Sequence, residues 1–426
     1  MIPKIDAGTI YSTLGNNSSL VPLAIKDVAN SCGLTTASYM AGDKTEGKDR
    51  FIDEFGTQAI WLWGIPAYKK ILDYLTFKPA KLDSKIDARI LKNPEILKAA
   101  QEFAPTDEIA KSIEKVSKNV SKFKNLTVAK FALSTILTSL TYFGLTKFRH
   151  KYTENQITKE YMQKQKVYKY NGDIPFSSAF SSVHKSKNIS FTGGVQDFMF
   201  DPVRNLMLVD GVITGERLSH SRNPQDFMGY VIKEGSFWAF MYFAGPMIAK
   251  ALEKHAQKVH NKSIDLDARV IENDAFKEAF KNGSIKKHLE VFNANNTSAA
   301  DIYKFAVNPE TDNLIIDMAK KSDIIALDDL SGKVDTRKYI DLSDLKGIGK
   351  KIENLLNQFE NSGEDIDTFF KSVRKLKRAS VIKNMGACIG ALGVIAPAIM
   401  LLVRKFGDNS EYQVKKDVEA KLEQQA

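Results

Sequence analysis

The residues that first suggest chemistry are two acid–base pairs with the same spacing: Asp87 with Arg89, and Asp267 with Arg269. A carboxylate and a guanidinium this close can form an ion pair, and an aspartate can also cap a helix by accepting backbone hydrogen bonds. A charged pair that occurs twice invites a functional interpretation. Capping and local pairing are commoner uses of such residues, so we predict a structural role for both pairs.

A second candidate is a glycine- and lysine-rich run at 340–356, in which Gly347 and Gly349 would allow a tight turn between two short amphipathic helices. The run resembles a helix-hairpin-helix element. The resemblance implies that backbone N–H groups at a helix N-terminus contact a nucleic-acid phosphate, with added charge from Lys346, Lys350 and Lys351. It covers fewer than about 20 residues, and such a turn arises readily without a ligand. Nucleic acid is therefore an alternative partner and not the leading one.

Patterns typical of enzymes and metal sites are missing from the sequence. A GxSxG elbow and an HExxH zinc motif do not occur, and the turn after Val209 matches no phosphate-binding loop. Cys32 and Cys388 are the only cysteines, and they form no CxxC pair. We therefore expect no catalytic residue, cofactor or metal, although a catalytic site assembled from distant residues stays open.

The elements that must position these residues occur twice along the chain. When 54–91 is laid over 234–271 without a gap, nine residues are identical, against roughly two for unrelated sequences of average composition. Pro66 falls on Pro246 in this alignment, and the two Asp-Ala-Arg sequences coincide. A second similarity joins 111–116 to 371–376, at a larger offset. The sequence therefore predicts two tandem parallel repeats, the second with a helical insertion.

The predicted boundaries follow from these offsets. The first repeat covers 1–165, a linker rich in Gly, Ser and basic residues covers 166–195, and the second repeat covers 196–426. The insertion falls at about 282–362.

Two long apolar segments indicate a membrane protein. Residues 385–403 contain no charge over a length that matches the hydrocarbon layer as an α-helix, so we predict a transmembrane segment there. Gly386 and Gly390 give this segment a GxxxG face that suits pairing with another helix. Residues 126–145 form the corresponding segment of the first repeat, and they contain Lys130, which could reach the interface.

Each repeat also contains an aromatic, proline-containing segment, at 56–77 and at 236–252. Their apolar runs are short for a clean crossing, and their Trp and Tyr side chains suit the headgroup level. An interfacial helix, a tilted span and a core helix all fit this pattern.

The composition agrees with a folded, mainly α-helical integral membrane protein whose partner is the lipid bilayer. The net charge of +10 suits an anionic neighbour such as lipid headgroups. Because no catalytic pattern is present, the leading hypothesis is a non-enzymatic structural, scaffolding or lipid-interacting role. A transporter or channel built from two parallel repeats is the alternative.

Overall fold

The computed structural model describes residues 6–16, 19–41, 43–166, 199–406 and 412–425. The protein is mainly α-helical, with 81% of the described residues in helices, which confirms the predicted helical character. Among these described residues, β pairing is limited to one bridge between Leu327 and Val334. The predicted linker at 166–195 lies almost wholly outside them.

The chain forms two compact units, and each combines stretches from both halves of the sequence. Unit 1 consists of 1–27, 65–135 and 237–391, and unit 2 consists of 28–64, 136–236 and 392–426.

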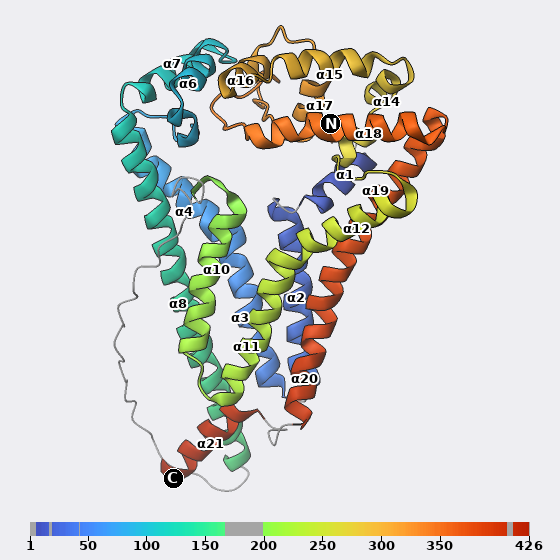
Figure 1. The fold of residues 1–426 in the computed structure, drawn as a ribbon. Helices are drawn as coiled ribbons and strands as arrows, with labels where there is room; N and C mark the ends of the chain where they lie inside the picture. Colours follow the sequence, from blue (N-terminus) through green and yellow to red (C-terminus); the bar gives the residue numbers. More distant parts are fainter. Residues whose placement is uncertain (1–5, 17–18, 42, 167–198, 407–411, 426) are drawn as a thin grey trace. The chain divides into compact units, whose positions relative to one another are not determined.

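Unit 2 is built from helices that are far apart in sequence (Figure 1). They are α2 (Leu20–Met40, from residue 28 onward), α3 (Lys44–Ala59), η1 (Ile60–Gly64), the later part of α8 (Val120–Lys166), α10 (Pro202–Ser219), α11 (Pro224–Trp238), α20 (Ala396–Phe406) and α21 (Gln413–Gln425). Small residues allow a close approach inside this unit, because a Cβ atom at Gly33 of α2 would lie 2.3 Å from the carbonyl oxygen of Gly393.

Unit 1 contains the remaining helices. Its first stretches hold α1 (Ala7–Gly15), α4 (Ile65–Leu72), η2 (Asp73–Phe77), α5 (Lys78–Ala80), η3 (Ala88–Lys92), α6 (Pro94–Glu102), α7 (Asp107–Ser117) and the beginning of α8. Its last stretch holds η4 (Ala239–Phe243), α12 (Ala244–His260), α13 (Ala268–Ile271), α14 (Asp274–Lys281), α15 (Ser284–Ala294), α16 (Ala299–Val307), α17 (Leu314–Lys321), α18 (Leu342–Ser362) and α19 (Ile366–Gly390). After α19 comes η5 (Ala391–Ile395), which belongs to unit 2 from residue 392 onward.

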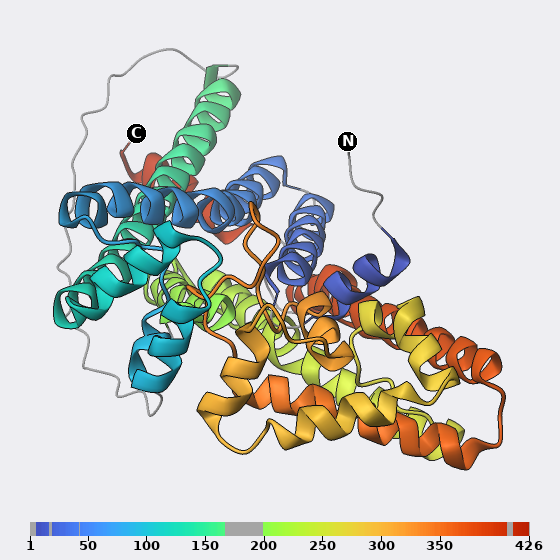
Figure 2. The same ribbon diagram turned by 90° about the horizontal axis from the view of Figure 1, so that it is seen from above.

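The predicted insertion at about 282–362 is helical. It carries α15 to α18, which Figure 2 shows grouped together in yellow and orange. Edge-to-face aromatic contacts join α18 and the flanking helices α14 and α19. Phe276 of α14 packs on Phe370 of α19 with ring centroids 6.0 Å apart, and Phe359 of α18 packs on Phe369 of α19 at 5.2 Å. Such pairs stabilise a core beyond the area that they bury.

Local sequence explains where several helices begin and end. The side chain of Asp43 accepts hydrogen bonds from Thr45 and Glu46 at the start of α3, and Asp201 does the same at the start of α10. Asn261 ends α12 and Gly363 ends α18 in the left-handed conformation that is common after a helix.

Four π-helical turns interrupt the helices, and a proline follows each turn within two or three residues. η1, η2, η4 and η5 precede Pro66, Pro79, Pro246 and Pro397, respectively. Proline has no backbone N–H, so a carbonyl group in the preceding turn loses its usual hydrogen-bond donor. A widened π-helical turn lets the carbonyl groups of that turn accept from other backbone N–H groups. The two aromatic segments at 56–77 and 236–252 therefore contain bulged helices.

Two helices are long and apolar enough to cross a membrane, and they contain the two predicted transmembrane segments. One runs over Val120–Gln163 and includes 126–145, and the other runs over Ile366–Val403 and includes 385–403. Gly386 and Gly390 contact no described side chain, since a Cβ atom at either would meet nothing within 4 Å.

Candidate functional site

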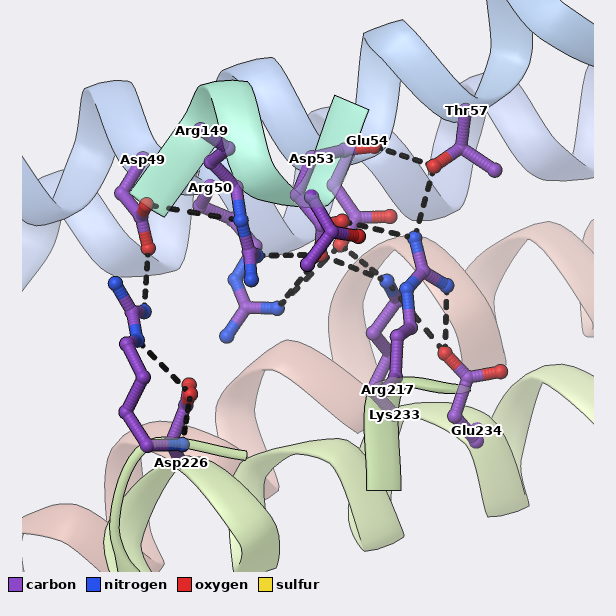
Figure 3. Close-up of polar contacts among 12 residues, drawn as sticks. Asp49, Arg50, Asp53, Glu54, Thr57, Arg149, Arg217, Asp226, Lys233 and Glu234 are labelled. Atoms are coloured by element: carbon purple, nitrogen blue, oxygen red, sulfur yellow. Dashed lines mark hydrogen bonds and ion pairs between the residues drawn. The ribbon is translucent and has the colours of Figure 1, made fainter. Parts of the chain in front are cut away.

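Ten charged side chains gather inside unit 2, and we call this group the charge cluster. It contains five acids and five bases, so its formal charges balance: Asp49, Asp53, Glu54, Asp226 and Glu234 against Arg50, Arg149, Arg217, Arg222 and Lys233. Figure 3 labels all of these residues except Arg222. They come from α3, α8, α10, α11 and the turn between α10 and α11.

Asp53 is the centre of the cluster and contacts cations from three other helices. Its carboxylate lies 3.1 Å from Arg149 Nη1, 3.1 Å from Arg217 Nη2 and 3.4 Å from Lys233 Nζ. The Asp53 side chain is only 3% exposed. A carboxylate this deep is costly unless it is paired, so the four side chains depend on one another.

Two glutamates complete the inner part of the cluster. Lys233 Nζ lies 2.8 Å from Glu54 Oε1, and Arg217 Nη1 lies 2.6 Å from Glu234 Oε1. Thr214 donates a further hydrogen bond of 2.8 Å to Glu234. Each cation therefore has at least two carboxylate partners.

Asp49 occupies the other end of the cluster. It accepts hydrogen bonds from Arg222 at 2.8 Å, from Thr153 at 2.6 Å and from the Tyr412 hydroxyl at 3.1 Å. Arg222 also bonds Asp226 at 3.2 Å. This end joins α3 and α8 to α11 and to the segment before α21.

Helix geometry explains why α3 can supply four of these groups. Residues four apart lie one above the other on a helix, so Asp49 stacks with Asp53, and Arg50 stacks with Glu54. Arg50 Nη1 lies 3.6 Å from Glu54 Oε1. The α3 sequence thus presents a polar face to the interior of the unit.

A cavity of about 260 Å³ adjoins the Asp49 end of the cluster. Its polar lining comes from the cluster and from residues near it, among them Asp49, Arg50 and Asp226. Its apolar lining comes from α11 and α20: Met228, Ile232, Met400 and Val403. The cavity can therefore receive a molecule with a charged part and an apolar part.

The Asp-Ala-Arg pairs lie in unit 1, at the start of short helical segments. Asp87 accepts a bond from the Arg89 amide at 2.8 Å and pairs with its guanidinium at 2.7 Å; Asp267 accepts the equivalent amide bond from Arg269 at 2.8 Å. Each aspartate thus caps a helix and holds an arginine. Arg89 also lies over the Tyr339 ring, 4.4 Å from its centroid.

The structure corrects the hairpin prediction at 340–356. A single helix, α18, runs through the region, with Gly347 and Gly349 in its interior. Leu345, Ile348 and Ile352 form a continuous buried stripe, and packing this stripe outweighs the cost of about 1 kcal/mol for each interior glycine. There is no second short helix whose N-terminal amides could meet a phosphate at these glycines.

The lysines of this run have other surroundings. Lys351 Nζ lies 3.4 Å from Asp265, and Lys351 and Gly347 line a cavity of about 510 Å³ in unit 1. Four aspartates line the same cavity against two lysines: Asp265, Asp267, Asp323 and Asp344 against Lys351 and Lys377. This balance disfavours a phosphate there.

Metal-binding geometry is not found in the described part of the chain, where no three His, Cys, Asp or Glu side chains are grouped to hold an ion. Comparison with protein-family models, with curated proteins and with solved structures finds no match to this chain. The charge cluster is therefore interpreted from its own geometry.

The charge cluster was not predicted from the sequence. The available signal was the i, i+4 spacing of Asp49 with Asp53 and of Arg50 with Glu54, beside an aromatic segment. Their partners are more than 90 residues away along the chain, and sequence spacing alone does not show that α8, α10 and α11 pack against α3.

Proposed function

We propose that this chain is an integral membrane protein with a lipid-interacting role, and that the helices of unit 2 enclose the charge cluster within the bilayer. The observation that carries the proposal is the polarity of unit 2. Trp63 and Val394 are 71% and 66% exposed, whereas Asp53, Arg149 and Lys233 are almost fully buried. In water, both features would be costly; in lipid, the apolar exterior is favourable and the ions pair inside.

The two long helices support the same proposal. Only 17% of the most apolar stretch of the helix Val120–Gln163 is buried within the protein, and only 28% of the most apolar stretch of the helix Ile366–Val403. An apolar helix in the core of a water-soluble protein would be enclosed by other residues. A lipid environment accounts for apolar surface that the protein itself leaves uncovered.

We also propose that the two halves are tandem repeats. The π-helical turns at 60–64 and 239–243 lie near the same offset, and α6 and α14 begin 180 residues apart after the capping residues Asn93 and Asn273. The two Asp-Ala-Arg caps share that offset. Similar local structure at matched positions supports a common origin.

A transporter is the second candidate, and the buried charge cluster is the observation that favours it. Ionisable residues inside a membrane bundle often mark a path for ions or protons. Vesicles that contain the protein and an internal pH dye would then show a proton flux above that of protein-free vesicles. A flux equal to that of protein-free vesicles would contradict proton transport.

The exposed Cys32 of α2 gives a direct test of membrane residence. In a Cys388→Ala variant in open membrane sheets, a charged maleimide should label Cys32 about tenfold more slowly than a water-exposed control cysteine, because a thiol in lipid neither ionises nor meets the reagent. A cysteine-free variant with Leu330→Cys is the matched control, since Leu330 is 96% exposed in unit 1.

Equal labelling of Cys32 and of the control cysteine in the membrane sheets would contradict the proposal. Release of the protein into the soluble fraction by alkaline carbonate would also contradict it. Retention in the membrane pellet together with a protected Cys32 is the expected result.

A further inference from the structure

The cavity beside the charge cluster has two chemically different walls. Met228, Ile232, Met400 and Val403 form an apolar wall, and Met228 and Val403 are themselves exposed at the surface of unit 2. Asp49, Arg50 and Asp226 form the polar end. A ligand that fills the cavity must therefore carry charge at one end and apolar groups at the other.

Arg50 leaves donor capacity toward this cavity. Its side chain is only 11% exposed, and Nη1 lies 3.5 Å from Asp53 and 3.6 Å from Glu54. Within the described part of the chain, this nitrogen makes no hydrogen bond. Nη1 is held against Asp53 and Glu54, neither of which lines the cavity. Nη2 lies 4.0 Å from the Cβ position of Gly229, a lining residue, so an anionic oxygen in the cavity would meet Nη2.

The acidic lining provides acceptors at the same end. Asp226 accepts two bonds from Arg222 through one oxygen, Oδ2, while its Oδ1 accepts none from the residues that the structure describes. Asp49 lines the same region. Carboxylate oxygens can each accept more than one bond, so a primary ammonium group would find partners here.

We propose that the cavity binds the headgroup of an aminophospholipid. The ammonium group would meet Asp226 and Asp49, the phosphate would meet Arg50, and the acyl chains would leave past Met228 and Val403. The volume of about 260 Å³ is several times the roughly 30 Å³ that a water molecule occupies in the liquid, so the cavity has room for a small polar headgroup. The inference rests on the proposed membrane residence and deepens the lipid-interacting role.

Gly229 offers a way to block the cavity without altering any charge. It lines the cavity in α11, and a Cβ atom there would lie 3.8 Å from Met400 Cε and 4.0 Å from Arg50 Nη2, which is ordinary contact. A leucine at this position would extend into the space. Gly235 lies on the same helix with nothing within 4 Å of its Cβ position, so Gly235→Leu is the matched control.

The test is native mass spectrometry of the delipidated full chain, titrated with phosphatidylethanolamine, phosphatidylcholine and phosphatidylglycerol of identical acyl chains. We expect the wild type and Gly235→Leu to bind phosphatidylethanolamine about tenfold more tightly than phosphatidylcholine. Gly229→Leu should lose that preference, because the headgroup can no longer enter.

Equal binding of the three lipids would overturn the inference, as would a preference that survives Gly229→Leu. Tighter binding of phosphatidylglycerol would also overturn it and would identify an anionic headgroup instead. The Cys32 labelling experiment separates this failure from the failure of membrane residence, since a protected Cys32 without lipid preference rejects only the headgroup assignment.

Discussion

At the scale of single residues, Asp53 determines how the charge cluster must behave. One carboxylate faces Arg149, Arg217, Lys233 and Arg50, and no other acid among the described residues contacts all four. Removing its charge would leave an excess of buried positive charge. The cluster is therefore a set of mutually dependent pairs, and single neutralisations should be far more harmful than balanced ones.

Asp53→Asn should lower the free energy of unfolding by about 3–5 kcal/mol, the usual cost of breaking a buried ion pair.

Glu54→Leu and Lys233→Met should each destabilise the protein, but the double variant should lose less than the sum of the two single losses. The double variant removes a whole ion pair, whose atoms lie 2.8 Å apart. Denaturant unfolding in mild detergent would measure the cycle. Additive losses would show that the Glu54–Lys233 pair is not coupled.

Asp341 gives a prediction of pH dependence in unit 1. Partial burial raises the pKa of Asp341, but hydrogen bonds from Ser343 and from the Asp344 amide outweigh burial, so the pKa lies below the ordinary 3.8. Because the pKa of Asp341 is lower in the folded protein than in the unfolded chain, its ionised carboxylate stabilises the fold above pH 3.8. This stabilisation is lost as the pH falls through the pKa that Asp341 has in the folded protein.

Asp341→Asn should therefore weaken α18 at pH 7 by roughly 0.5 kcal/mol, the scale of a charge at a helix N-terminus, and should have no effect well below pH 3.8. Hydrogen–deuterium exchange of α18 peptides, corrected for intrinsic rates, would show about twofold faster exchange at pH 7. Asp312→Asn, at an exposed position, is the control. A deficit that persists at low pH would mean that the aspartate charge is not responsible.

At the scale of elements, the sequence predicted helices better than it predicted their partners. Apolar runs and capping residues identify helices because both signals are local, as with Asn93 before α6 and Asp365 before α19. The hairpin prediction failed because Gly347 and Gly349 look like turn residues only when the buried stripe of α18 and its packing partner are unknown. The π-helical turns before the prolines are explained by the missing proline N–H, but no sequence pattern marks in advance where they occur.

The two glycines of α18 give a matched pair of substitutions. A Cβ atom at Gly349 would lie 2.7 Å from Cε1 of the fully buried Phe292, whereas one at Gly347 would meet nothing within 4 Å. Gly347→Ala should stabilise the helix by about 0.5–1 kcal/mol through its higher propensity. Gly349→Ala should destabilise unit 1 by about 1–3 kcal/mol, since the Phe292 ring must shift in a packed core.

Hydrogen–deuterium exchange of α18 and α15 would measure both effects. Equal stabilisation by the two alanines would mean that α18 does not approach Phe292 closely. Loss of stability in both variants would indicate that each glycine adopts a non-helical turn, as the hairpin interpretation requires.

At the scale of the whole molecule, composition alone conceals the main feature. An apolar fraction of 43% and a mean hydropathy of −0.26 are ordinary for a water-soluble protein, because the unit 1 helices are rich in charge and offset the apolar segments. Only the structure shows that unit 2 gathers the charge cluster in its interior while apolar side chains such as Trp63 and Val394 are exposed. That distribution could not be predicted from sequence, since it depends on which faces of α3, α8, α10 and α11 meet.

The same distribution makes two exposed apolar residues respond in opposite ways to a charge. Ile395 is the last residue of η5, lies inside the charge-free segment 385–403 and is 57% exposed, and Leu330 is 96% exposed in unit 1. In water, a lysine would be tolerated at both positions. In the bilayer, a lysine at 395 costs about 3 kcal/mol, because its ammonium group cannot easily reach an interface. Ile395→Lys should therefore reduce the amount of folded, membrane-inserted protein several-fold, whereas Leu330→Lys should leave that amount unchanged. Size-exclusion profiles of fluorescently tagged protein from detergent-solubilised membranes would compare the variants, and a normal yield for Ile395→Lys would place that face of the helix in water.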